Sequence, residues 1–207
     1  MKRFIYACDI GSTLRRNFAW ARGEPGSASL KPGTDISEIA DLVAEDLQSG
    51  SSVALGFEAP LFLPVPESTT ELSKRRDGES DRSWAALTGA YVATLALHQA
   101  AWILRRIRGR AQMFSFSLNW REWPPAGPDP TLLCWEAFIS GKSKGKTHKA
   151  DAEKGVREFL KLEGRLKFAS NSVTANPRIS MIAAAALWAG ISDDVGLLHQ
   201  ECFVVKP

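Results

Sequence analysis

The sequence has little cysteine and no long apolar run. Cys8, Cys134 and Cys202 are its only cysteines, they are widely spaced, and no CxxC pair occurs. An odd number at such spacing predicts neither a disulfide framework nor a zinc site. The longest unbroken apolar run, 181–189, is too short to cross a bilayer, and Asp9 interrupts the N-terminal apolar run before it could act as a secretory signal. We therefore expect a cytoplasmic protein with no membrane partner.

The sequence also has only a small excess of charge of one sign. The 26 basic and 23 acidic residues leave a net charge of +3, which permits a polyanionic partner but does not require one. With 44% hydrophobic and 24% charged residues among 207, the composition is that of a globular chain and excludes global disorder. The length predicts one domain over residues 1–207, and oligomeric state leaves no signal in the sequence.

Apolar periodicity and turn signals predict a mixed α/β fold. Strands are expected at 3–10, 18–22, near 28–30, 52–57 and 131–139, with another possible at 201–205. Helices are expected after a cap at Thr34 or Asp35, over 84–108, from about 147, and over 177–189. A long polar loop at about 61–83 and a helical extension at about 171–207 complete the organisation. This order of elements indicates a mixed sheet with helices on it.

Acids near the ends of the apolar strands are the main candidates for chemistry. Asp9, Glu58 and Glu136 each lie near the carboxyl end of such a segment, and Asp151 lies in the first turn of a later helix. Ligands of open α/β sheets bind outside the carboxyl ends of the strands, and acids converging there repel each other unless a cation lies among them. Oxygen ligands without cysteine favour Mg²⁺ or Mn²⁺. The helical angle places His148 on the same side as Asp151.

Each feature also has an ordinary structural interpretation. A strand-end acid is often a turn or cap residue, and Glu136 could lie on an exposed edge. Lysines in the glycine-rich segment SGKSKGKTHK and arginines in KRRDGESDR could hold a phosphate backbone, or could belong to solvated loops. The candidates for phosphate contacts are Lys144, Lys146, Lys149, Arg75 and Arg76.

Several short motifs resemble one family. HKADAEKGVREF is similar to the acidic helix of RuvC-type Holliday-junction resolvases. GFEAPLFLP, CWEAFISG and ISMIAAAALWAGISDD resemble predicted nucleases of a domain-of-unknown-function family in the ribonuclease H-like superfamily. The resemblance implies a five-stranded mixed sheet with helices on both faces. Its first three strands form an antiparallel meander, and the fourth and fifth strands run parallel to the first.

The resemblance also implies a two-metal-ion nuclease that acts on DNA or RNA. Asp9 would bridge two ions about 4 Å apart. Glu58, Glu136 and Asp151 would complete the ligand set, and His148 would lie beside the attacking water or an ion. These five residues are the catalytic candidates, and the four acids are the metal ligands.

The chain departs from the family at the last helix. Many relatives carry an Asp-Ala pair there, whereas this sequence has Ser180 and Met181. Either Asp151 takes the role of that acid, or the site is incomplete and the domain only binds nucleic acid or protein. A third alternative is an actin-like ATPase, because DIGST resembles the first phosphate loop of that class. That fold uses two such domains, and this length supplies one.

Overall fold

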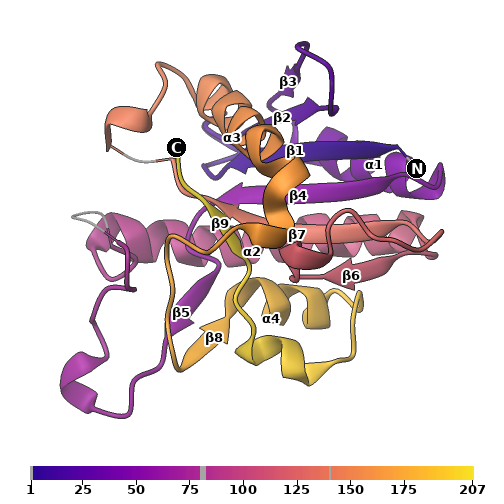
Figure 1. Cartoon of the computed structure of the whole chain (residues 1–207). Helices are drawn as coiled ribbons and strands as arrows, with labels where there is room; N and C mark the ends of the chain where they lie inside the picture. The colour runs from indigo at the N-terminus through magenta and orange to yellow at the C-terminus, as the bar shows by residue number, and fades with distance from the viewer. Residues whose placement is uncertain (1, 80–82, 140) are drawn as a thin grey trace.

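A mixed sheet forms the centre of the structure, a computed structural model that describes residues 2–79, 83–139 and 141–207 (Figure 1). Residues 80–82 of the predicted long loop and residue 140 lie outside the described residues. The strands are β1 (Arg3–Asp9), β2 (Ala19–Gly23), β3 (Lys31–Gly33), β4 (Ser52–Glu58), β5 (Phe62–Pro64), β6 (Ser115–Ser117), β7 (Thr131–Ala137), β8 (Arg178–Ser180) and β9 (Phe203–Val205). The α-helices are α1 (Ile36–Gln48), α2 (Leu87–Arg110), α3 (His148–Leu162) and α4 (Met181–Trp188). Short 3-10 helices are η1 (Thr69–Glu71), η2 (Trp120–Glu122), η3 (Gly141–Ser143), η4 (Glu163–Phe168) and η5 (Val195–His199).

The strand order confirms the mixed α/β class. Strands β1, β2 and β3 form an antiparallel meander, and β4 and β7 run parallel to β1 in the order β3-β2-β1-β4-β7. Two further strands, β6 and β9, pair in parallel with the two halves of β7, so the sheet has seven strands among the described residues rather than five. The sequence does not predict β6 because three residues are too few to show a hydrophobic periodicity. The hydrogen bonds of β6 are formed with β7, which follows later in the chain.

Several boundaries differ from the predicted ones. The third strand lies at Lys31–Gly33 rather than 28–30. The loop at 61–83 contains β5, which pairs with β8 and so removes residues 178–180 from the predicted helix at 177–189. That helix begins at Met181, where the Ser180 side chain accepts a hydrogen bond from the Ala183 N–H. The segment 171–207 is therefore part helix and part strand, not a helical extension.

Helices cover both faces of the sheet. One core lies between the sheet and α1, α2 and α4, and a second lies under α3. Asp35, one of the two predicted caps, accepts hydrogen bonds from the N–H groups of Ser37 and Glu38 at the start of α1. Among the described helices, α2 alone has the length and apolar composition to cross a membrane. It packs against α1 and α4.

Small residues let α3 lie close to the sheet. A Cβ on Gly155 of α3 would lie 3.1 Å from the Ala7 Cβ and 3.5 Å from the Ala137 Cβ. In the same row of the sheet, a Cβ on Gly56 would lie 2.3 Å from the Trp135 side chain, so only glycine leaves room for this indole. Asp151 lies one helical turn before Gly155, and the close packing therefore brings its carboxylate to the rim of the sheet.

Candidate metal centre

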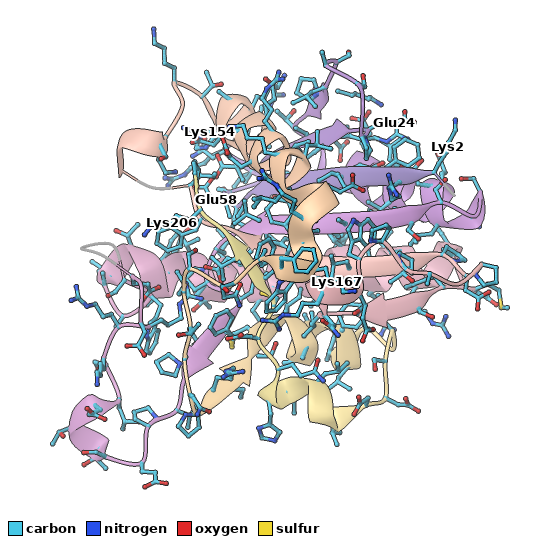
Figure 2. The ribbon with its side chains drawn as sticks, in the orientation of Figure 1. Lys2, Glu24, Glu58, Lys154, Lys167 and Lys206 are labelled. Atoms are coloured by element: carbon cyan, nitrogen blue, oxygen red, sulfur yellow. The ribbon has the colours of Figure 1, made fainter. Side chains whose placement is uncertain are left out.

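The register of two parallel strands places Asp9 beside Glu58. These two residues are direct partners at the carboxyl ends of β1 and β4, so their side chains point to the same face. Figure 2 shows Glu58 at the carboxyl end of β4, with Lys2 and Glu24 toward the opposite ends of the strands. The sequence-based expectation that these acids converge at the carboxyl ends is met for this pair.

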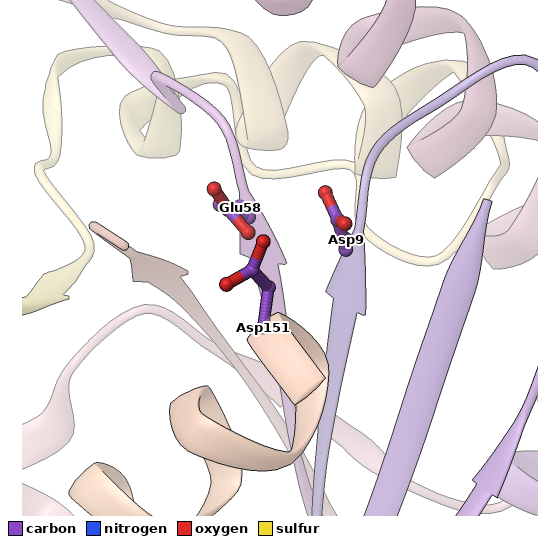
Figure 3. A group of neighbouring side chains, drawn as sticks. All are labelled: Asp9, Glu58 and Asp151. Atoms are coloured by element: carbon purple, nitrogen blue, oxygen red, sulfur yellow. The ribbon is translucent and has the colours of Figure 1, made fainter. Parts of the chain in front are cut away.

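Asp151 approaches the pair from the first turn of α3 (Figure 3). The Thr147 side chain caps this helix by accepting a hydrogen bond from the Ala150 N–H, and the Asp151 Oδ1 accepts one from the Gly145 N–H at 2.5 Å. One oxygen each of Asp9, Glu58 and Asp151 lies within 4.8 Å of the others. Three carboxylates from distant parts of the chain thus form one acidic cluster.

Two basic side chains contact this cluster. The His148 Nδ1 lies 2.6 Å from the Asp9 Oδ2, and the imidazole is 49% exposed. The Lys144 Nζ lies 3.0 Å from the Glu58 Oε1 and 3.6 Å from the Asp151 Oδ2. His148 therefore contacts the cluster from the start of α3. Its role beside an attacking water or an ion stays a prediction. The ion pairs of Lys144 have no signal in the sequence, because they depend on the path of the loop between β7 and α3.

Burial and mutual repulsion raise the pKa of two of the acids. Burial is the main cause that raises the pKa of Asp9, and the hydrogen bond from His148 opposes it. Burial, followed by the charge of Asp9, raises the pKa of Glu58 to about 8, although Lys144 opposes the shift. Burial alone would lower the pKa of Lys144, but the charges of Glu58, Asp9 and Asp151 raise it. One lysine thus offsets only part of the negative charge of three carboxylates.

Glu58 retains an oxygen that can take a ligand. Its Oε2 is buried and has no hydrogen-bond partner among the described residues, and the side chain is only 11% exposed. An unsatisfied buried carboxylate oxygen is costly, and a cation would remove that cost. The three carboxylates are hard oxygen donors, which fit Mg²⁺ or Mn²⁺. The residues present are therefore suited to a divalent cation.

Glu136 does not join the cluster, contrary to the sequence-based expectation. Glu136 pairs with Phe57 rather than with Glu58. Because side chains alternate between the two faces along a strand, this shift of one residue directs the Glu136 side chain to the opposite face of the sheet. Its two oxygens accept hydrogen bonds from Arg76 at 2.7 and 2.8 Å and from the Leu61 N–H at 2.9 Å. Both oxygens are occupied, so Glu136 is corrected from metal ligand to structural residue.

Arg76 is likewise not placed to bind phosphate. Its side chain is fully buried and also donates to the Glu79 Oε1 at 2.9 Å, so it links two glutamates inside the fold. Arg76 reaches Glu136 on the face of the sheet opposite the acidic cluster, which explains why a polar sequence segment contains a buried arginine. Its neighbour Arg75 is exposed and has no ion pair with a described residue.

The lysine-rich loop and a cleft border the cluster. Lys146 and Lys149 are exposed on either side of the start of α3, and Lys144 extends from the same loop. A cleft of about 540 Å³ opens beside Glu58 and Lys144 and extends toward Val92 of α2. Of the three clustered acids, Glu58 lines this cleft.

Comparison with known proteins identifies no relative: no family model, curated protein or solved structure matches this chain.

Proposed function

We propose that the chain is a divalent-cation-dependent phosphodiesterase that hydrolyses nucleic acid on a ribonuclease H-like fold. The observation that carries the proposal is the meeting of the Asp9, Glu58 and Asp151 oxygens within 4.8 Å, with the Glu58 Oε2 unpartnered among the described residues. The antiparallel meander and the two parallel strands that follow are compatible with that fold. The motif resemblance supports the same assignment.

Asp9, Glu58 and Asp151 would hold Mg²⁺ or Mn²⁺. A divalent ion supplies Lewis-acid chemistry at a phosphodiester, by activating water and stabilising the negative charge of the leaving oxygen. Glu136 takes no part in holding the ion, because Arg76 and the Leu61 N–H occupy its oxygens.

His148 is the candidate for moving a proton. When its Nδ1–H donates to the Asp9 Oδ2, the neutral ring leaves Nε2 as an acceptor. The exposed imidazole can then take a proton from an attacking water at Nε2, while Asp9 holds its tautomer and orientation.

The lysine loop would position the substrate. Lys146 and Lys149 are exposed beside the cluster and can contact phosphate oxygens of a nucleic-acid backbone. Such contacts orient the substrate without reading its sequence. Lys144 offsets part of the charge of the acids before an ion is bound.

Nuclease assays with Mg²⁺ and Mn²⁺ test this proposal. Single-stranded and duplex DNA and RNA would be incubated with the protein and with the variants Asp9→Asn and Glu153→Gln. Glu153 lies on α3 two residues after Asp151 but outside the acidic cluster, so it is a matched control. We expect hydrolysis that requires the ion, is abolished in Asp9→Asn and is retained in Glu153→Gln. Activity that survives Asp9→Asn contradicts the proposal.

A metal-free binding domain is the second candidate. It is favoured by the contacts of Lys144 and His148, which already give the acids basic partners. Calorimetric titration with Mn²⁺ separates the two candidates. Heat of binding that disappears in Asp9→Asn supports the phosphodiesterase, and no binding to the folded wild-type protein supports the binding domain.

A further inference from the structure

A second cavity lies on the other side of the loop that follows Asp9. Its volume is about 320 Å³, and the loop residues Ser12 and Thr13 and the α2 residues Tyr91, Gln99 and Trp102 line it. Ser12 is three residues after Asp9, so at most about 11 Å of extended chain separates the two. The cavity therefore lies close to the acidic cluster but on the α2 side of the sheet.

Gln99 lines this cavity and holds an unsatisfied hydrogen-bond acceptor among the described residues. The residue is only 4% exposed, and its Nε2 donates to the Gly11 carbonyl at 2.7 Å. That bond fixes the orientation of the amide, and its Oε1 is buried with no partner among the described residues. A buried amide oxygen without a donor calls for a ligand group that carries an N–H or O–H.

Two aromatic side chains line the same cavity as Gln99. Tyr91 is 63% exposed and Trp102 is 39% exposed, and both extend from the face of α2 that carries Gln99. Exposed rings beside one buried acceptor suit a flat, partly apolar ligand that carries an N–H donor. A nucleobase has both properties, because it stacks on aromatic rings and carries N–H groups on its edge.

We infer that this cavity binds one unpaired nucleobase of the substrate. The inference rests on the proposed phosphodiesterase function, since a nucleotide whose phosphate lies at the acids can reach around the Gly11 loop with its base. Because duplex pairing buries the base edge, the substrate class is single-stranded or locally unpaired nucleic acid. The Gln99 Oε1 accepts from the base, and Tyr91 and Trp102 flank it.

Calorimetry in EDTA tests the inference without divalent ions or hydrolysis. Adenosine and ribose, which lacks the base, would be titrated into the full chain, so that no phosphate meets the acids without a cation. We expect ribose to bind at least tenfold more weakly than adenosine. Tyr91→Ala and Gln99→Met should each weaken binding of adenosine about fivefold or more. Leu87→Ala is the matched control, because Leu87 is 91% exposed on the same helix and does not line the cavity.

The outcomes separate this inference from the proposed function. Equal binding of the two ligands, or unchanged binding in a folded Tyr91→Ala variant, overturns the base site. Tyr91→Ala keeps the test decisive if Gln99→Met fails to fold, because the tyrosine is largely exposed. Base binding in a protein that shows no nuclease activity refutes the phosphodiesterase alone. Nuclease activity without base binding refutes the base site alone.

Discussion

Lys144 competes with a cation for the acidic cluster, and replacing it should strengthen ion binding. In the metal-free protein its ammonium contacts the Glu58 Oε1 and the Asp151 Oδ2, so its charge lies beside two of the three carboxylates that would hold a divalent ion. An ion that binds there is repelled by the lysine and must disrupt these ion pairs. Lys144→Met keeps much of the aliphatic side chain and removes the charge. The dissociation constant for Mn²⁺ should therefore fall.

The separations set the size of the effect. Above about pH 8, where Glu58 is ionised, two unit charges in water attract by about 1.4 kcal/mol at the 3.0 Å from Nζ to Glu58 and by about 1.2 kcal/mol at the 3.6 Å to Asp151, so the comparison is made at that pH. Lys144 is 39% exposed, so salt screening and side-chain ordering offset part of this sum. A net change of about 1.4 kcal/mol, roughly half of the sum, corresponds to about tenfold tighter binding.

Isothermal titration calorimetry with Mn²⁺ measures this change directly. Lys146→Met is the control, because Lys146 is exposed on the same loop and forms no ion pair with a described residue. Its dissociation constant should stay within about twofold of the wild-type value, consistent with the small effect of an exposed charge. If Lys144→Met binds Mn²⁺ as tightly as the wild type, or more weakly, Lys144 does not compete for the site and the reasoning is wrong.

Three further predictions concern stability. Because burial raises the pKa of Glu58 from 4.5 to about 8, the native state holds a proton in this interval that the unfolded chain has released. The free energy of unfolding in EDTA, measured by urea titration, should therefore fall as the pH rises from about 5 to about 8. Glu58→Gln should make this decrease less steep, and an equally steep decrease in that variant would contradict the assignment. Arg76→Met leaves two buried glutamates unpaired and should lower the free energy of unfolding by about 3–5 kcal/mol; a loss below about 1 kcal/mol would show that the buried ion pairs contribute little. Gly56→Ala should lower the free energy of unfolding by about 1–3 kcal/mol in the same urea titrations, because the added Cβ would lie 2.3 Å from Trp135. Gly109→Ala in α2 is the control, because Gly109 has open space around it, and it should leave the free energy of unfolding unchanged or raise it by up to about 1 kcal/mol.

Much of the local structure could be read from the sequence. The helical spacing of Ile39, Val43 and Leu47 predicted α1, and Asp35, one of the two predicted caps, is its N-cap. The continuous apolar runs predicted β1, β4 and β7 as buried central strands, and they occupy neighbouring positions in the sheet. These predictions succeed because periodicity and capping depend on residues near each other in the chain. The short strands β6 and β8 could not be read, since each of them depends on a distant partner.

The candidate site was only partly readable. Acids at the ends of buried strands identified Asp9 and Glu58, and an acid in the first turn of an amphipathic helix identified Asp151. Glu136 fitted the same pattern, yet the structure places it on the other face with Arg76. A continuous apolar run hides the two-residue alternation that would have told the faces apart. The buried partner Arg76 was hidden in a polar segment that resembles a solvated loop.

The sequence by itself determined which segments are buried and which of them carry an acid at the carboxyl end, because burial and local periodicity are properties of short stretches of chain. Only the tertiary structure decided which acids share a pocket. A shift of one residue between parallel strands reverses the face of every side chain, so the pairing of Asp9 with Glu58 and of Glu136 with Phe57 separates a metal centre from a buried ion pair.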